Sequence, residues 1–248
     1  MKVAARRVKS LRILEGKGLS AQLRRKHQIF LLSPANLAGL RASYILGPTG
    51  RSDLACRLRQ DGVTLGELFT FISGLYFRGK LAYAQAFCAP PLDISGSFVI
   101  TASAGLVPPQ TVVTVDQLRE MSGTDIDAGE HRYRTPLDRD CHSLAKSLGE
   151  SCDAILLGSI ASAKYVEPLL DIFGERLLFP AEFVGRGDMS RGGLMLRSVA
   201  MSKELEYLPV LNATRHGRRP PKLSPLVVAR AKSKGRTSHA DTPPVAPG

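Results

Sequence analysis

The fold class follows from four apolar residues, Ile29-Phe30-Leu31-Leu32, which are ended by Ser33-Pro34. A short run without polar residues is typical of a strand buried on both faces, because a strand with one solvated face alternates apolar and polar side chains. Three more apolar runs follow, at 98–102, 153–157 and 177–179. We therefore predict an α/β fold, with a mostly parallel sheet that carries helices on both faces.

Between these runs, apolar residues recur at the spacing of a helix. In 63–87, Thr64 and Glu67 have the spacing of a capping box, and Gly74 and Gly79 interrupt the pattern so that a second helix is expected to start near Tyr76. Pro136 suits the first turn of another helix, after a polar loop at 125–134. Further predicted elements are helices at 36–46, 164–173 and 195–200, and a terminal strand at 207–210.

Length and composition indicate a single domain. The 248 residues, 44% of them hydrophobic, suffice for one α/β core, which we place at 28–211. No apolar run reaches the length of a membrane span, and no apolar stretch of signal-peptide type follows the basic start, so no membrane association is expected. The four cysteines are widely separated, which favours reduced thiols and a cytoplasmic location.

Positive charge is concentrated at the two ends of the chain. The net charge is +12, and residues 1–27 hold nine Lys or Arg against one acidic residue, whereas 212–248 hold eight against one. The core between them is slightly acidic. We predict a basic, flexible N-terminal arm and a basic, Pro-rich disordered tail, which either contact the phosphates of DNA or RNA or only keep the protein in solution.

Small and hydroxylated residues follow the predicted strands. In open parallel sheets the ligand binds at the carboxyl ends of the strands, so the loops after them are expected to meet. These loops predict a ligand-binding set that consists of Ser33, Thr101, Ser103, Gly158 and Ser159.

A glycine-rich loop at 185–193 is the strongest single indication of a binding site. Glycine allows a backbone to approach a ligand closely, and arginine offers a planar set of donors for a phosphate or a base edge. We predict ligand contacts from Arg186, Gly187, Ser190 and Arg191. Asp188 is a candidate for general acid–base catalysis, for orientation of Arg186, or for capping the helix that follows.

Tyr76 and Lys80 are four residues apart and share one face if the segment is helical. A lysine beside a tyrosine can lower the pKa of the phenol, so both are candidate catalytic residues, although Tyr76 in the core with a surface lysine is the simpler reading. Tyr165 is a candidate for stacking on a planar ligand, and packing is its alternative role.

Several site types are absent from the sequence. The sequence contains no Walker motif, which argues against an ATPase. No GxGxxG motif follows the first predicted strand, which argues against a dinucleotide-dependent dehydrogenase. No Cys/His cluster has zinc spacing, and no histidine is placed to complete a serine triad. We therefore predict neither a cofactor nor a metal.

Four segments within 29–197 together resemble the YaaA-type peroxide-stress proteins and related bacterial and phage domains of unknown function, and more distantly the core domain of archaeosine synthases. They are Leu31-Leu32-Ser33-Pro34, the segment 73–84 with Tyr76, the segment 99–108, and Ile155-Leu156-Leu157-Gly158 with 164–169. The resemblance implies a link to nucleic acid or modified bases. Where the family often has Lys followed by Tyr or His, this chain has Ser103 and Ala104, so such a lysine is either lost or replaced by Lys80, Lys164 or an arginine.

Two functions remain open from the sequence. The first is a nucleic-acid-associated protein with a nucleobase or nucleotide pocket, which acts on a base or nucleotide in DNA or RNA modification or in a stress response. The second is a non-catalytic DNA- or RNA-binding stress or defence protein whose pocket has decayed. A protein-interaction scaffold is a third possibility, and whether the protein is an enzyme stays undecided.

Overall fold

The computed structural model describes residues 27–48, 50–221 and 223. The predicted apolar runs form the strands at the centre of the molecule, and shorter strands flank them. The strands are β1 (His27–Leu32), β2 (Val63–Thr64), β3 (Ser97–Ile100), β4 (Leu106–Val107), β5 (Val112–Val113), β6 (Cys152–Leu157), β7 (Leu177–Pro180) and β8 (Tyr207–Pro209).

The main sheet is mixed and mostly parallel, with the strand order β4-β3-β1-β6-β7-β8. Strand β1 pairs in parallel with β3 on one side and with β6 on the other, and β6 pairs in parallel with β7. The two edge strands, β4 and β8, are antiparallel to their neighbours, and β2 and β5 form a separate two-stranded sheet. The α/β fold with a mostly parallel sheet is thus confirmed.

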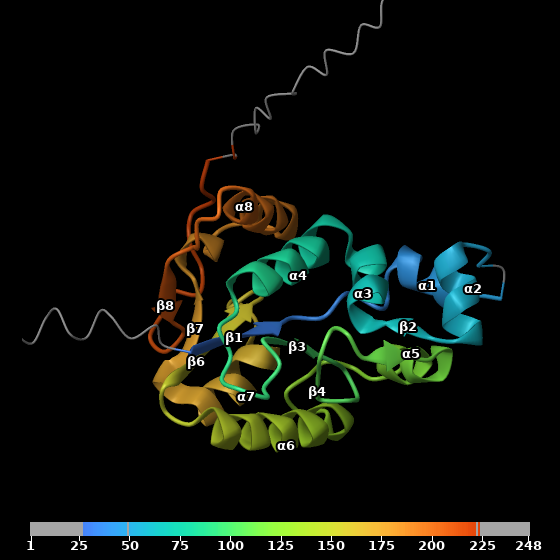
Figure 1. Cartoon of the computed structure of the whole chain (residues 1–248), viewed down its shortest axis with the longest axis horizontal. Helices are drawn as coiled ribbons and strands as arrows, with labels where there is room; N and C mark the ends of the chain where they lie inside the picture. The colour runs from blue at the N-terminus through green and yellow to red at the C-terminus, as the bar shows by residue number, and fades with distance from the viewer. Residues whose placement is uncertain (1–26, 49, 222, 224–248) are drawn as a thin grey trace, which may run out of the picture.

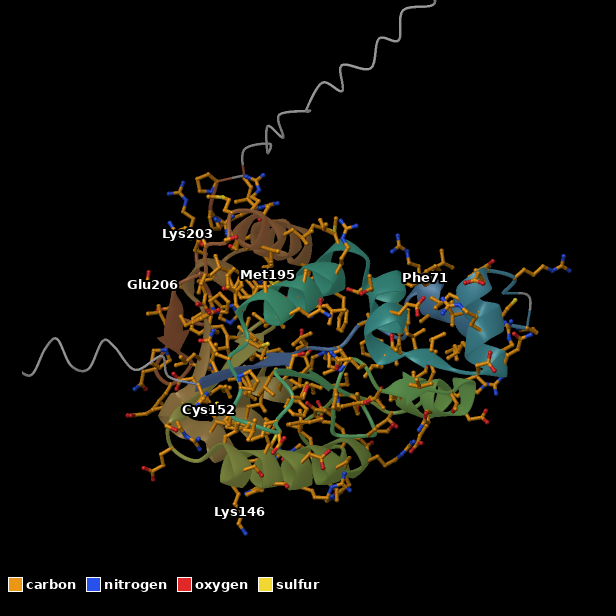
Figure 2. The ribbon with its side chains drawn as sticks, in the orientation of Figure 1. Phe71, Lys146, Cys152, Met195, Lys203 and Glu206 are labelled. Carbon is orange, nitrogen blue, oxygen red and sulfur yellow. The ribbon has the colours of Figure 1, made fainter. Side chains whose placement is uncertain are left out.

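Helices connect the strands. They are α1 (Leu40–Leu46), α2 (Asp53–Gln60), α3 (Leu65–Ser73), α4 (Leu75–Phe87), α5 (Val115–Ser122), α6 (His131–Leu148), α7 (Ala163–Phe173) and α8 (Asp188–Ala200). Figure 1 shows α4 and α8 side by side on one side of β1, with α6 on the other, while α1, α2, α3 and α5 gather beyond the end of β1. Figure 2 shows buried Met195 of α8 toward α4, whereas Lys146 and Lys203 project outward.

Local sequence signals explain where several helices begin. Thr64 caps α3 as predicted, because its hydroxyl oxygen accepts a hydrogen bond from the Glu67 amide. Gly74 separates α3 from α4, close to the predicted break. Two predictions were wrong. Helix α8 begins at Asp188, inside the predicted glycine-rich loop, and helix α6 begins at His131, inside the predicted polar loop and before Pro136.

Strand β1 occupies the position in the sheet where a ligand crevice is expected. The chain leaves β1, passes through α1 to α4 and returns to β3 on one side, whereas β6 lies on the other side and connects onward to β7. Neighbouring connections that run in opposite directions leave a crevice at the carboxyl ends of the strands. The residues that follow β1 and β6, Ser33 and Gly158, therefore lie beside each other at this edge.

The two predicted arms fall largely outside the described residues. Of 1–27 only His27 is described, and it begins β1. Of the predicted tail, 212–221 and 223 are described, and the Arg218 carbonyl lies against Gly185 at the start of the glycine-rich segment. In the part of the chain that the structure describes, no helix combines the length and apolar character needed to cross a membrane.

Candidate functional site

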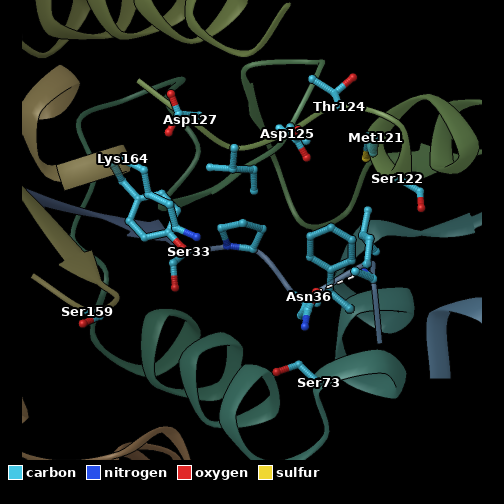
Figure 3. A pocket seen from close by; sticks show the side chains of 18 of the residues that line it. Ser33, Asn36, Ser73, Met121, Ser122, Thr124, Asp125, Asp127, Ser159 and Lys164 are labelled. Carbon is cyan, nitrogen blue, oxygen red and sulfur yellow. Dashed lines mark hydrogen bonds between the residues drawn. The ribbon is translucent and has the colours of Figure 1, made fainter. Parts of the chain in front are cut away.

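A cavity of about 660 Å³ lies between the carboxyl edge of the sheet and the group of helices α1, α3 and α5. Its wall combines the loop after β1, the ends of α3 and α4, the segment after α5, the loop after β6 and the first residue of α8. Figure 3 shows Thr124, Asp125 and Asp127 on one side of this pocket and Ser73 and Ser159 on the other, with Ser33 between them. The residues are 33–38, Phe69, Ser73, Tyr76, Ala102, 121–122, 124–127, Ser159, Lys164, Tyr165 and Asp188.

Ser33 is held at the wall of this pocket by a lysine from α4. The Lys80 ammonium donates to the Ser33 hydroxyl oxygen and to the Ser33 carbonyl oxygen, both at 2.7 Å. Lys80 is 0% exposed and Ser33 is 5% exposed. A buried charge without compensating partners is costly, so these two oxygen atoms are what allows an ammonium group at this position.

Burial lowers the pKa of the Lys80 ammonium to about 7. The negative charge of Asp188 opposes this shift, and the positive charge of Arg191 adds to it. The Lys80 nitrogen also lies 4.0 Å from the centre of the Tyr76 ring, whose face attracts a cation. Lys80 is therefore poised to exchange a proton near neutral pH, which an exposed lysine is not.

Tyr76 shares a face with Lys80 as expected, but the predicted effect on its phenol was wrong. Burial raises the pKa of Tyr76 to about 12, with the nearby charge of Arg191 opposing the rise. The desolvation of the phenolate outweighs the effect of a neighbouring cation. The Tyr76 hydroxyl is buried and has no hydrogen-bond partner within the described residues, so it remains protonated and available as a donor.

A close crossing of α4 and α8 sets the geometry around Lys80. A methyl group on Gly79 would lie 2.8 Å from the Gly192 carbonyl oxygen, and one on Gly192 would lie 2.8 Å from the Leu75 carbonyl oxygen. Both distances are shorter than a carbon atom tolerates, so the crossing requires glycine on both helices. Gly192 of the predicted loop thus acts in helix packing, and this crossing brings the start of α8 to the pocket.

Asp188 and Arg191 lie one helical turn apart at this start. The Arg191 guanidinium is buried and donates from Nε and Nη2 to the Phe183 carbonyl oxygen, at 3.2 and 3.1 Å. Its third group, Nη1, lies 3.4 Å from Asp188 Oδ1. Asp188 therefore faces Arg191 rather than Arg186, and Arg191 secures the turn before α8 while contributing positive charge behind the pocket.

The loop after β6 and the first turn of α7 supply another part of the pocket wall. Gly158 approaches Ser33 so closely that a methyl group at Gly158 would lie 3.0 Å from the Ser33 Cβ atom. Ser159 and Tyr165 line the pocket as predicted. Burial raises the pKa of Tyr165 to about 12, so its phenol is protonated, and the Lys164 ammonium lies 5.2 Å from the centre of its ring.

Among the predicted residues, Lys80, Gly158 and Arg191 contact residues of the pocket wall without lining the pocket themselves, and two further groups lie away from it. Thr101 is 0% exposed, and its hydroxyl donates to the Gly105 carbonyl oxygen and accepts from the Ala104 amide, so it closes its own loop, beside Ser103. Arg186, Gly187 and Ser190 line a separate cavity of about 330 Å³ against 219–221 and 223. Helical periodicity accounts for this separation, because Asp188, Arg191 and Gly192 lie toward α4 and the pocket, whereas Gly187 and Ser190 face the other cavity.

Sequence reasoning missed two parts of the site. Residues 121–122 and 124–127 form one wall, yet the sequence predicts only a polar loop from Asp125 onward and nothing for 121–124. Asn36 is another wall residue, and its side-chain oxygen accepts from the Ala38 amide. One feature of the sequence indicates that Lys80 is buried. Its position in the helix places it on the same face as the apolar residues Phe77, Tyr83 and Ala84.

Three carboxylates and one ammonium group line the pocket, namely Asp125, Asp127 and Asp188 against Lys164. The pocket is therefore more acidic than the Arg-rich cradle expected from the sequence. Within the described ranges, no group of three or more His, Cys, Asp or Glu side chains is close enough to hold a metal ion. The side chains present serve hydrogen bonding, stacking and proton exchange.

Comparisons with protein-family models, with curated proteins and with solved structures found no match for this chain.

Proposed function

We propose that the protein is an enzyme whose pocket binds a nucleobase or nucleoside. The size of the cavity supports this proposal, because about 660 Å³ lies within the range of small-molecule sites. Carboxylates at Asp125 and Asp127 accept hydrogen bonds from the N–H groups of a base, and the aromatic ring of Tyr165 offers a stacking surface for a planar ligand. The YaaA resemblance points to the same class of ligand.

Nucleotides with several phosphates fit the pocket less well. Carboxylates repel phosphate, and the arginine expected to bind it, Arg191, has its donors engaged by the Phe183 carbonyl oxygen and Asp188. Arg186 contacts the Glu182 carbonyl oxygen and Ser190 beside the other cavity. We therefore narrow the proposed ligand from a nucleotide to an uncharged or cationic base or nucleoside.

The observation that carries the proposal of an enzyme is Lys80, fully buried and bonded to Ser33 at the wall of the pocket. A binding protein gains nothing from a lysine whose ammonium must be desolvated, whereas an enzyme uses such a group for proton transfer. We take both faces of the sheet to be covered by helices, so that the ligand enters from the carboxyl edge. The thiols of the four cysteines, all within the described residues, are reduced, which suits the proposed cytoplasmic location.

Calorimetric titration of the full-length protein with nucleobases, nucleosides and nucleoside triphosphates tests the ligand class. We expect binding of a base or nucleoside, weakened by Asp125→Asn and Asp127→Asn, and no binding of triphosphates. Asp171→Asn is the matched control, since Asp171 is an exposed aspartate of α7 outside the pocket. Preference for triphosphates, or equal binding by all variants, would contradict the proposal.

A second candidate function is nucleic-acid binding without catalysis, and the described part of the C-terminal segment favours it. Arg218 and Arg219 are exposed, and they lie near Arg186 on the outer side of the start of α8. Positive groups arranged in this way neutralise phosphates, with an affinity that falls as salt rises. The double variant Arg218→Glu and Arg219→Glu should bind DNA or RNA more weakly than the wild type. The control Lys146→Glu on α6 should not. Equal affinity of the double variant and the control would exclude this surface.

A further inference from the structure

Ser33 and Lys80 have an arrangement that the proposed ligand class does not by itself require. The Ser33 hydroxyl oxygen lies 2.7 Å from the Lys80 nitrogen and 3.4 Å from the Leu157 carbonyl oxygen. When Lys80 is charged, its ammonium donates to Ser33, and the hydroxyl hydrogen turns to Leu157. When Lys80 is neutral, it keeps a donor for the Ser33 carbonyl oxygen and can accept the hydroxyl hydrogen with its lone pair.

From this geometry we infer that Ser33 is a nucleophile and Lys80 its general base, in a serine–lysine pair that acts on an ester or amide. The inference rests on the proposed function in that the same pocket receives the substrate, an acyl derivative of a base- or nucleoside-sized molecule. Serine is a weak nucleophile unless an adjacent base takes its proton, and lysine is a known alternative to histidine in that role.

The surroundings of the pair fit the reaction. Ser33 faces the pocket, while Lys80 lies behind it without exposure, so water does not compete for the lysine lone pair. The charged and titratable groups near Lys80 are Tyr76 on its own helix and Asp188 and Arg191 on α8. Tyr76 also lines the pocket, and its unpartnered hydroxyl is a donor for the oxygen atom on which negative charge develops.

The reaction balances with water as its only co-reactant. The Ser33 oxygen bonds to the carbonyl carbon while its proton moves to Lys80. The bond from carbon to the leaving oxygen or nitrogen then breaks, and the leaving group takes the proton from Lys80. Water attacks the resulting acyl-Ser33 ester, gives its proton to Lys80, and the Ser33 oxygen leaves with that proton.

A fluorophosphonate probe tests the inference, because an activated serine displaces fluoride from its phosphorus atom. We expect full-length wild-type protein to be labelled at Ser33, as located by peptide mass spectrometry, and Ser33→Ala to lose the label. Lys80→Met should slow labelling by about 10²–10⁴-fold. Ser143→Ala is the control, because Ser143 on α6 is more exposed than Ser33 and is expected to contribute nothing.

The pH dependence of wild-type labelling gives a measurement that does not require a folded lysine variant. We expect the labelling rate to rise as Lys80 loses its proton around pH 7 and then to level off. A folded wild-type protein without label at Ser33, or with labelling that does not follow this rise, would overturn the inference. Ser33→Ala should still bind the base or nucleoside, so loss of labelling and loss of ligand binding identify separate failures.

Discussion

Two neighbouring strands of the sheet, β1 and β3, end in a buried hydroxyl residue, but the two hydroxyls have different partners. Thr101, after β3, bonds to the backbone of Ala104 and Gly105 within its own loop. Ser33, after β1, bonds to Lys80, which is 47 residues away on α4. The local bonds of Thr101 stabilise a turn, whereas the distant, titratable partner of Ser33 is the basis of the chemistry that we propose at the edge of the pocket.

The largest expected difference between the two regions is in pH dependence. The pKa of Lys80 is about 7 in the folded protein and near its ordinary value of 10.5 in the unfolded chain. Between these values the unfolded chain holds the proton and the folded protein does not, so the free energy of unfolding rises with pH. Over this window the rise attributable to Lys80 is about 5 kcal/mol.

Lys80→Met isolates this contribution. Chemical denaturation of wild type and variant at several pH values should show a stability difference that changes steadily between about pH 7 and pH 10. Cys141 and the buried tyrosines also titrate with shifted pKa values, but both proteins contain them, so their effect cancels in the difference. A difference that is constant with pH would mean that Lys80 does not change its protonation on unfolding in this window.

The second largest effect concerns the close crossing of α4 and α8, which holds Lys80 beside Ser33. Gly192→Ala should lower the free energy of unfolding by about 3 kcal/mol, because the added methyl group would meet the backbone of α4. Gly193→Ala is the matched control. A methyl group there would lie 3.7 Å from Leu223, and a helical alanine should stabilise by about 0.5–1 kcal/mol. If the neighbouring glycines respond alike to substitution, then the close crossing does not hold Lys80 in place.

Removal of each hydroxyl in turn should have an intermediate effect on stability. Thr101→Val should cost about 2 kcal/mol, since it removes the acceptor of the Ala104 amide, although the Gly105 carbonyl keeps its bond from the Thr101 amide, and it should keep ligand binding and probe labelling. Ser33→Ala should lose labelling while remaining folded. Thermal unfolding together with labelling checks both variants. Loss of labelling in folded Thr101→Val would remove the distinction between the two strand ends.

The smallest effect is expected at Gly158, which touches Ser33 but not Lys80. Gly158→Ala places a methyl group about 3.0 Å from the Ser33 Cβ atom, which should cost about 1 kcal/mol and shift the hydroxyl away from Lys80. Slower labelling at Ser33 is the expected readout. Gly187→Ala, where nothing lies within 4 Å, should leave labelling unchanged, and a slower reaction in that variant would favour the predicted glycine-rich cradle instead.

Much of the fold could be predicted from local patterns. The apolar runs became β1, β3, β6 and β7, and Thr64 and Gly74 mark helix boundaries close to the expected ones. The same patterns failed in the segment 185–193, where Gly192 and Gly193 were read as a loop. Glycine is unfavourable in a helix by itself, but here the contact with α4 outweighs that cost.

The sequence by itself determined the α/β class, the order of the strands along the chain and a set of hydroxyls at the strand ends, because apolar periodicity and caps act over a few residues. Only the tertiary structure decided that Lys80 donates a hydrogen bond to Ser33, that Thr101 bonds within its own loop, and that Arg186 lies apart from the pocket. Those outcomes depend on how β1, α4 and α8 pack. The protonation of Lys80 depends on burial by residues far from it in the chain, which no local pattern specifies.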